Sequence, residues 1–462
     1  MPTIIVFCHL RWDFVFQRPQ HLLTRLANYY NIIVVEEPIF HDGESFLKKS
    51  TPSSNITICQ PHTPVHAAGF HDDQLSLLEP LVMDLVPEGE DPIVWFYTPM
   101  ALPILQSLHP SLVLYDCMDE LAAFRNSPKQ LLQRETALLG IADLVFTGGP
   151  SLYEAKRNRH HDVHCFASSV DVSHFEQALD RLNSHIEHRD ISGPRLGFYG
   201  VIDERLDLDL IAAVADAHAQ WQIVLVGPVV KIDPASLPRR DNIHYLGQQS
   251  YEALPQFLAG WDVCLLPFAL NEATKFISPT KVLEYMAAEL PVVSTAITDV
   301  VQPYGDVVSI AHSAQEFVQA CEEALAMNEV QRTAMVRRMR EVVAKTSWNA
   351  TAAQMRELMQ HGQQMKLAAA AETMGQALSE IDSLADTYVG KTESLAPNVS
   401  AFRKSSSTHF SAQSGSAAHL SAATRTIGAF EDHSETALID GNTVVKRVSE
   451  ASRTPDRHTE AK

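Results

Sequence analysis

The residues best suited to chemistry lie between Ser278 and Thr295, a stretch that predicts a helix followed at once by a buried strand. Ser278 is a favoured N-cap residue, and Pro279 suits the first helical position. The start of such a helix has free backbone amides that attract an anion. Lys281 adds a positive charge, and Glu284 lies on the same helix face and can accept hydrogen bonds from sugar hydroxyls. The stretch predicts a pocket for a sugar carried on phosphates; the alternative is an ordinary capped helix with a surface ion pair.

A glycine and an arginine form a second candidate site. A predicted strand ends at Gly200, and Arg205 lies in the loop that follows it. Glycine lets a ligand approach the backbone closely, and a guanidinium group pairs well with phosphate. A tight strand–helix turn with a solvated arginine is the alternative interpretation.

Two loops in the first half of the chain also follow predicted strands and carry polar side chains. The first contains His9, Arg11 and Arg18, which can line a cleft, and it lacks the glycine fingerprint of a classical NAD site. The second contains Asp116 and Asp119, whose carboxylates can serve as acid or base, or can cap the next helix. No histidine cluster has the spacing of metal ligands, so we expect no metal site.

Short apolar runs alternate with helical patterns around these loops. The runs consist mostly of Val, Ile, Leu and Phe, as expected for strands that are covered on both faces. Alternation of such strands with helices predicts a parallel, doubly wound α/β sheet. The strands predicted in the first half are residues 3–8, 32–36, 56–59, 93–97, 112–115, 143–147 and 163–166.

The pattern stops and restarts, which predicts a second domain of the same kind. We expect a first domain over residues 1–171, a polar connection over 172–194 and a second domain over 195–350. A helical segment over 351–389 follows. Residues 390–462 are rich in Ser, Thr, Ala and Gly, and we expect this tail to be disordered because it offers little apolar surface to bury.

Composition narrows the classes of function. The 462 residues carry a formal charge of −20, which argues against a nucleic-acid-binding surface. Six scattered cysteines indicate reduced thiols rather than disulfides. The chain shows no signal segment, and no apolar run reaches the roughly 18 residues that span a bilayer. We therefore expect a cytoplasmic protein, with peripheral association at the inner face of a membrane left open.

The second half resembles the group 1, GT4-like glycosyltransferases of the GT-B fold. Matching segments occur in the order found in that family, and the most specific of them is 278–295. In the first half, the Gln-Arg-Pro-Gln-His run at 17–21 and the Asp-Cys-Met-Asp-Glu run at 116–120 resemble members linked to cell-surface polysaccharides. The other matching segments are 196–200, 221–227, 242–247 and 251–267.

The resemblance implies two Rossmann-like domains that face a cleft, with a nucleoside-diphosphate-sugar on the second domain and a hydroxyl acceptor on the first. It implies a hexosyltransferase-like enzyme that retains anomeric configuration and needs neither metal nor cofactor. Carried over by position, Glu284 binds the donor ribose, the 278–281 segment lies near the diphosphate or the sugar, and Gly200 and Arg205 contact phosphate. Asp116 and Asp119 are the candidates for acid–base catalysis or acceptor orientation.

Three features depart from the family pattern. Glu289 stands where the family usually has a glycine. Phe276 stands where the family usually has a glutamate, and a lysine expected after Gly200 is missing, so Lys275 or Lys281 is the candidate for that second charge. Two other functions therefore stay open. One is a different GT-B nucleotide-sugar enzyme, such as an epimerase, and the other is a non-catalytic subunit that binds nucleotide-sugar.

Overall fold

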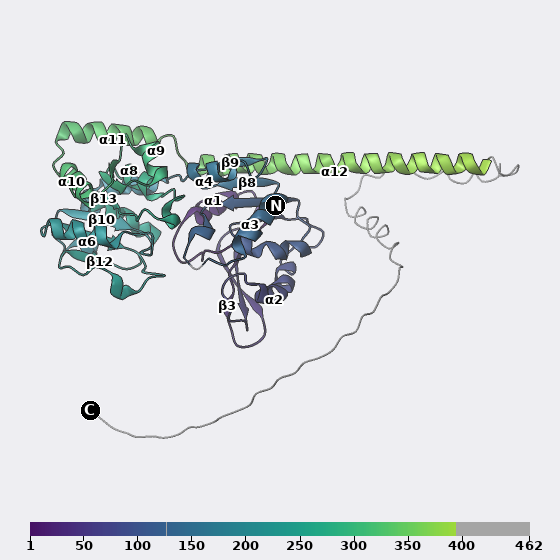
Figure 1. The fold of residues 1–462 in the computed structure, drawn as a ribbon, viewed down its shortest axis with the longest axis horizontal. Coiled ribbons are helices and arrows are strands. Elements are labelled where there is room, and N and C mark those ends of the chain that lie inside the picture. The colour runs from purple at the N-terminus through teal and green to yellow at the C-terminus, as the bar shows by residue number, and fades with distance from the viewer. Residues whose placement is uncertain (126, 394–462) are drawn as a thin grey trace, which may run out of the picture. The chain divides into compact units, whose positions relative to one another are not determined.

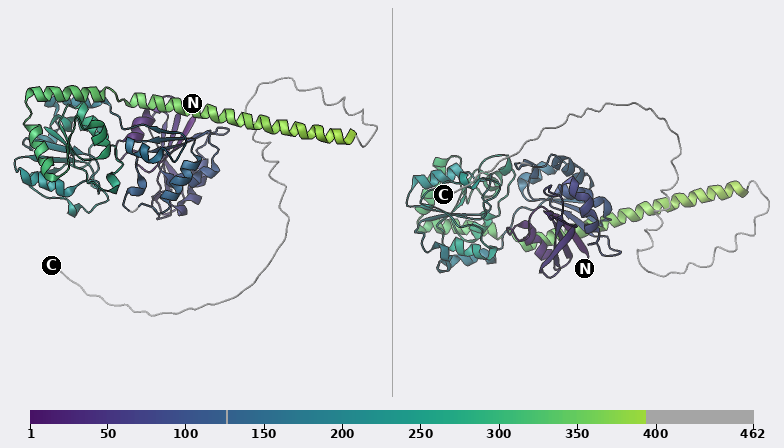
Figure 2. Two further views of the ribbon diagram at one scale, coloured as in Figure 1. Left: turned by 45° about the horizontal axis from the view of Figure 1, so that its top comes forward. Right: turned by 90° about the horizontal axis from the view of Figure 1, so that it is seen from below.

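The computed structural model describes residues 1–125 and 127–393, with side chains as far as residue 383. These residues form two α/β domains and a long C-terminal helix, shown in Figure 1 and in two further views in Figure 2. The parallel α/β fold predicted from the apolar runs is confirmed. Of the predicted disordered tail, residues 390–393 still belong to the helix, and the rest lies outside the described residues.

The first domain is built on a sheet in the order β3-β5-β2-β1-β6-β7-β8-β9, with β4 attached to β5. Every pairing is parallel except that of β4 with β5, because β4 returns beside β5 as a hairpin. The sequence pattern missed β3 and β4, whose residues are exposed and lack an apolar run. The strands are β1 (Thr3–Cys8), β2 (Asn31–Glu36), β3 (Ile39–Phe40), β4 (Phe46–Ser53), β5 (Ile56–Thr63), β6 (Ile93–Phe96), β7 (Leu112–Cys117), β8 (Leu144–Thr147) and β9 (Val163–Cys165).

Helices cover both faces of this sheet, which explains why its central strands are apolar throughout. One face packs against α1 (Arg18–Leu26) and the start of the long C-terminal helix. The other face packs against α2 (Asp72–Met83), η1 (Pro99–Ser107), α3 (Leu131–Ile141) and α4 (Pro150–Lys156). A short turn of helix, η2 (Leu121–Ala123), follows β7. The loops after its parallel strands therefore all lie at the carboxyl end of the sheet.

The second domain has a fully parallel six-stranded sheet in the order β12-β11-β10-β13-β14-β15. Its strands are β10 (Arg195–Tyr199), β11 (Gln222–Val226), β12 (Ile243–Tyr245), β13 (Val263–Leu266), β14 (Val292–Thr295) and β15 (Ser309–Ala311). Its helices are α6 (Leu208–Ala217), η6 (Pro234–Ser236), η7 (Tyr251–Ala253), α7 (Leu254–Ala259), η8 (Glu272–Thr274), α8 (Lys281–Ala287), α9 (Thr298–Tyr304), α10 (Ala314–Leu325) and α11 (Glu329–Val343).

The connection over 172–194 is more structured than its polar composition predicts. It contains α5 (Val172–Phe175), η3 (Glu176–Leu179), η4 (Arg181–Asn183) and η5 (Ile186–His188). Three of its apolar residues, Phe175, Ala178 and Ile191, are buried in the core of the second domain. The connection therefore packs as part of that domain.

Helix α8 begins later than the sequence predicts. Helix α8 starts at Lys281 with Thr280 at the N-cap position, so the expectation that Ser278 caps it is wrong. The carbonyl of Ser278 instead accepts a hydrogen bond of 2.7 Å from the hydroxyl of Ser168 in the first domain. Ser278 thus anchors the segment before α8 to the first domain. The local sequence pattern does not reveal this contact.

The C-terminal helix α12 (Trp348–Glu393) returns from the second domain to the first, where it lies along the sheet domain in both figures. Trp348, Met355 and Met359 are buried in the core of the first domain. Further along the helix, Lys366 Nζ lies 2.8 Å from a carboxylate oxygen of Asp143. The segment 351–389, for which the sequence predicts helix, lies within this longer helix.

Candidate functional site: a cleft between the two domains

A pocket of about 150 Å³ is lined by both domains and contains most of the residues selected from the sequence. A wider pocket of about 670 Å³ shares Tyr199, Gly200 and Tyr251 with it and extends along the second domain. The loop after β1 borders both pockets. The polar and charged residues of the smaller pocket are Gln17, Arg18, Asp119, Ser168, Tyr199, Arg205, Tyr251, Ser278, Thr280, Lys281 and Glu284.

The floor of the smaller pocket is bare backbone where β10 ends. Gly200 has a φ of +137°, and Gly227, after β11, has a φ of +145°; side chains are strained in this region. A Cβ at Gly200 would lie 2.9 Å from Lys281 Nζ, and a Cβ at Gly227 would meet the backbone of Gly200. Both glycines are therefore required by close packing, and they leave room for a ligand to approach the main chain.

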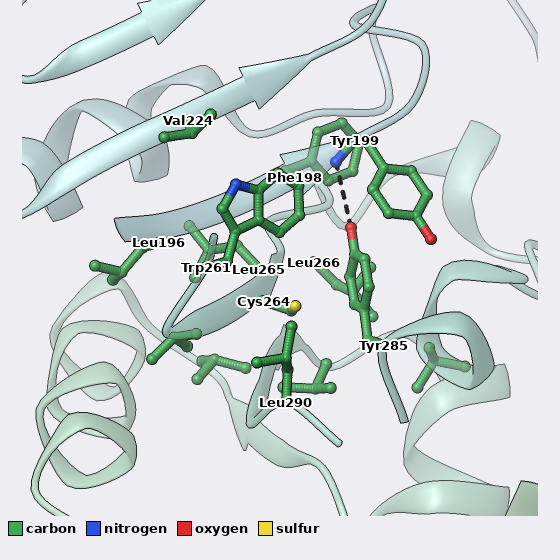
Figure 3. Close-up of a cluster of buried hydrophobic side chains, with 14 of the residues drawn as sticks. Leu196, Phe198, Tyr199, Val224, Trp261, Cys264, Leu265, Leu266, Tyr285 and Leu290 are labelled. Carbon is green, nitrogen blue, oxygen red and sulfur yellow. Dashed lines mark hydrogen bonds between the residues drawn. The ribbon is translucent and has the colours of Figure 1, made fainter. Parts of the chain in front are cut away.

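Tyr199 is fixed from below by the core of the second domain. Its backbone N–H donates to the hydroxyl of Tyr285 at 3.3 Å, the dashed line in Figure 3. The indole of Trp261 packs against Gly197 so closely that any Cβ there would overlap it. This packing fixes the end of β10 and therefore the position of Gly200 in the cleft.

Glu284 is a buried residue in the first turn of α8, and Tyr199 holds its side chain in place. The tyrosine hydroxyl donates to Glu284 Oε2 at 2.5 Å. Burial raises the pKa of Glu284, although the Tyr199 hydrogen bond and the Lys281 charge act in the opposite direction.

Lys281 supplies a buried positive charge beside Gly200. Burial lowers the pKa of its ammonium group, and the nearby Glu284 carboxylate partly offsets that effect. Its Nζ lies 5.8 Å from the centre of the Phe198 ring. No ion pair with Lys281 occurs within 4.0 Å among the described residues, so the ammonium group is available to an anion.

Arg205 is held in place by Asp203. Its Nη2 lies 2.8 Å from Asp203 Oδ2, and its Nε also donates to this carboxylate. Burial disfavours the guanidinium charge, but these hydrogen bonds outweigh it and raise the pKa of Arg205. The guanidinium also lies 5.6 Å from the ring centre of Phe124, a residue of the first domain. Arg205 therefore faces the cleft at a fixed position.

The first domain contributes Asp119 to the pocket, but it buries Asp116. Burial raises the pKa of Asp119, opposed by the charges of Arg205 and Lys231 across the cleft. Asp116 is fully buried, and its carboxylate accepts three hydrogen bonds from Arg18, the shortest of 3.0 Å. Asp116 therefore orients Arg18, which lines the pocket, whereas Asp119 itself reaches the cleft.

The remaining predicted cleft residues lie outside the smaller pocket. His9 directly follows β1, and burial lowers its pKa to about 4, so its ring is neutral near pH 7. Arg11 pairs with Glu36 at 3.2 Å and also donates to the carbonyl of Glu37. Lys275 is exposed and lies 3.9 Å from Glu272. Of the two lysines proposed for the second charge, only Lys281 lines the pocket.

Sequence reasoning missed Tyr199 and Lys231, and it missed the contact that Phe276 makes with the first domain. Tyr199 was passed over although it precedes Gly200 directly. Phe276 packs against the apolar core of the first domain, so the residue that replaces the family glutamate makes a contact across the domains. Lys231 has a φ of +62° and lies 5.0 Å from the ring centre of Phe124. Only Tyr199 carries a sequence signal, its place at the end of a strand.

The described residues contain no group of three or more His, Cys, Asp or Glu side chains arranged to hold a metal ion. Within the same residues, no helix combines the length and apolar character needed to cross a membrane.

Comparison with known proteins matches the second domain to one family. Residues 193–327 match the model of the "Glycosyl transferases group 1" family. A relative, the "Putative teichuronic acid biosynthesis glycosyltransferase TuaH" of Bacillus subtilis (strain 168), is 26% identical over 299 residues. That alignment covers 59% of this chain and 73% of the relative.

Solved structures share the fold over most of the chain. Sucrose-phosphate synthase from Thermosynechococcus elongatus has a TM-score of 0.60 and 16% identity, over 78% of this chain and 99% of its own. The Anabaena protein HepE, in complex with UDP and glucose, has a TM-score of 0.57 and 15% identity, over 78% of this chain and 100% of its own. At this identity, the likeness shows the fold.

Proposed function

We propose that this chain, a group 1 glycosyltransferase with the GT-B fold, takes its sugar from a nucleoside-diphosphate donor bound in the cleft and transfers it to a hydroxyl of a cell-surface polysaccharide or glycoconjugate. The observation that carries this proposal is the pairing of Lys281 with the bare backbone at Gly200. A diphosphate placed on that backbone meets the Lys281 ammonium group and lies within the reach of the fixed Arg205 guanidinium.

The donor is proposed to span both pockets. Its diphosphate lies at Gly200 and Lys281, and the Glu284 carboxylate accepts hydrogen bonds from donor hydroxyls. The wider pocket extends from these residues along the ends of β11 and β12 and offers space for the base. Aromatic residues of the loop after β1, Trp12, Phe14 and Phe16, border that space from the first domain.

In the proposed reaction, the acceptor oxygen bonds to the anomeric carbon on the same face from which the diphosphate departs, as the bond from that carbon to the phosphate oxygen breaks. The acceptor proton passes to the departing diphosphate, so no net charge is created. Lys281 and Arg205 stabilise the negative charge that develops on the leaving group, which is the main electrostatic requirement of this step. We propose that the anomeric configuration is retained and that these cations act without a metal.

Asp119 is proposed to orient the acceptor rather than to form a covalent bond. It is a carboxylate of the first domain that lines the smaller pocket, and it faces Arg205. The TuaH relative is named for teichuronic acid biosynthesis, so an acceptor of cell-envelope polysaccharide chemistry is the proposed class. We propose that the transfer to this acceptor takes place at the inner face of a membrane.

The experiment is a nucleotide-release assay on the full chain with UDP-, GDP- and ADP-sugars, with and without cell-envelope extract. We expect one donor to release nucleoside diphosphate in the presence of extract, to do so equally with EDTA, and to fail with Glu284→Ala. Conversion of the donor sugar without extract would instead indicate an epimerase. Nucleotide-sugar binding with no turnover under any condition would indicate a binding subunit and contradict the proposal.

A further inference from the structure

The turn after β8 brings the first domain against the second domain beside the smaller pocket. This turn, residues 148–151, contains two glycines, a proline and a serine, and it leads into α4. The backbone N–H of Ser151 donates to Asp299 Oδ1 of the second domain at 3.1 Å. Asp299 is 1% exposed, and the next residue, Val300, is buried in the core of the second domain. The Asp299 carboxylate is therefore a fixed hydrogen-bond acceptor for the first domain.

The glycine at position 149 allows this close fit. A Cβ at Gly149 would overlap the Asp299 carboxylate and would lie 2.7 Å from the Cβ of Ser278. Because Cβ atoms do not approach other heavy atoms this closely, only glycine fits here. The residue before it, Gly148, lines the smaller pocket. The turn therefore fills the space between Asp299 and Ser278 at the wall of the pocket.

The segment before α8 is an irregular loop that the first domain contacts at several points. Residues 275–280 lie between η8 and α8 and belong to neither a helix nor a strand. Phe276 packs against the core of the first domain, and the Ser278 carbonyl accepts the hydrogen bond from Ser168. Residues 277–281 line the smaller pocket. Contacts with the first domain therefore hold the chain just before Lys281.

We propose that Asp299 and Gly149 are positioning residues for the donor site, which hold the segment 276–280 and thereby place Lys281. Asp299 itself lines neither of the two cleft pockets, so it acts through the turn and not on the donor. A segment that is already held in its binding position loses less conformational entropy when a ligand binds, which raises affinity. The inference rests on the proposed function for the identity of that ligand, a nucleoside diphosphate.

The hydrogen bond between Ser151 and Asp299 joins two domains that have separate cores. Beside Asp299, the side chain of Val300 belongs to the core of the second domain, whereas Leu152 of α4 belongs to a core of the first domain. Loss of the bond leaves both cores intact. We therefore expect its effect on the position of the segment before α8, and not on the folding of either domain.

The first test needs no ligand and measures hydrogen–deuterium exchange in the full chain by mass spectrometry. In Asp299→Ala and in Gly149→Ala, we expect the amides of residues 276–284 to exchange about tenfold faster than in the wild type, because each change removes an interaction of about the strength of one hydrogen bond. Asp299→Asn keeps an acceptor oxygen for Ser151, and Gly140→Ala adds a Cβ that meets nothing within 4 Å. Both of these controls are expected to exchange as the wild type does, and so are strands β10 and β13 in every variant.

Exchange at the wild-type rate in Asp299→Ala and Gly149→Ala would overturn the inference. Faster exchange throughout β10 and β13 would also overturn it, because that result indicates a general loss of structure. An Asp299→Asn protein that exchanged as fast as Asp299→Ala would contradict the hydrogen bond as the cause.

The second test is the Kd for UDP, GDP and ADP, measured by calorimetry. We expect Asp299→Ala and Gly149→Ala to bind the diphosphate that the wild type prefers about tenfold more weakly, with Asp299→Asn and Gly140→Ala unchanged. Unchanged affinity in a variant whose segment exchanges faster would overturn the positioning role. A wild type that bound none of the three would contradict the proposed function, whereas the exchange result would still decide whether Asp299 and Gly149 hold the segment.

Discussion

The side chain of Lys281 lies over the backbone of Gly200, with its Nζ 2.9 Å from the place where any other residue would carry a Cβ. Lys281 begins helix α8 and Gly200 directly follows strand β10, and 80 residues of sequence separate them. Their contact places a cation over exposed main chain. The predictions below start from this contact and move outward.

Gly200→Ala is expected to lose most nucleotide affinity. The added Cβ displaces Lys281, and the φ of +137° adds strain. The measurement is calorimetric binding of UDP, GDP and ADP. Gly89→Ala is the matched control, since Gly89 also has a positive φ but a Cβ there meets nothing within 4 Å. Equal affinity in both variants would show that the Lys281 contact is not needed.

Removing the charge of Lys281 is expected to weaken diphosphate binding, and the effect has a pH signature. Because burial lowers the Lys281 pKa, the free protein loses this charge at a lower pH than an ordinary lysine does. Affinity for the diphosphate should therefore fall as pH rises through that lowered pKa. Lys281→Arg should bind with little change over the same range, and Lys281→Met should bind weakly at every pH. The measurement is the Kd against pH.

Tyr199→Phe is expected to reduce donor affinity roughly tenfold, because a hydrogen bond to a charged group contributes about 1.5–3 kcal/mol and here positions Glu284. Tyr245→Phe is the control, since that hydroxyl donates only to the backbone carbonyl of Pro238 in the same domain. If Tyr199→Phe bound nucleotide-sugar as the wild type does, Glu284 would not depend on this bond.

Asp116→Ala is expected to destabilise the fold by about 3–5 kcal/mol, because it leaves the buried Arg18 guanidinium without its partner. Denaturant unfolding measures the loss. The double variant Arg18→Met/Asp116→Leu removes both charges and should recover much of the stability. A fully stable Asp116→Ala protein that lacked only turnover would instead assign Asp116 to catalysis.

His21 is expected to make the protein sensitive to acid. Its ring stacks on Trp348 at 4.7 Å, and burial lowers its pKa to about 3. The unfolded chain takes up a proton near pH 6.5 while the folded ring stays neutral, so stability falls as the pH drops from 6.5 toward 3. At pH 4 this loss is about 3 kcal/mol. His21→Phe should show a smaller drop in Tm between pH 7 and pH 4 than the wild type.

The apolar runs of the sequence determined the fold, since strands that are buried on both faces leave a continuous pattern of Val, Ile and Leu. The resemblance at 278–295 likewise selected Lys281 and Glu284, and both line the pocket. Exposed strands such as β4 left no such pattern and were missed. The start of α8 was placed two residues early, because the contact of Ser278 with Ser168 is not local.

Only the tertiary structure separated Asp116 from Asp119. Sequence spacing made them equal candidates, but Asp116 lies within β7 and points inward to Arg18 of α1, whereas Asp119 lies in the loop after β7 and faces the cleft. The sequence specifies the chemical groups that each side chain carries. The surroundings of that side chain depend on segments that are distant along the chain, and they decide whether a charge is buried with a partner or left to meet a ligand.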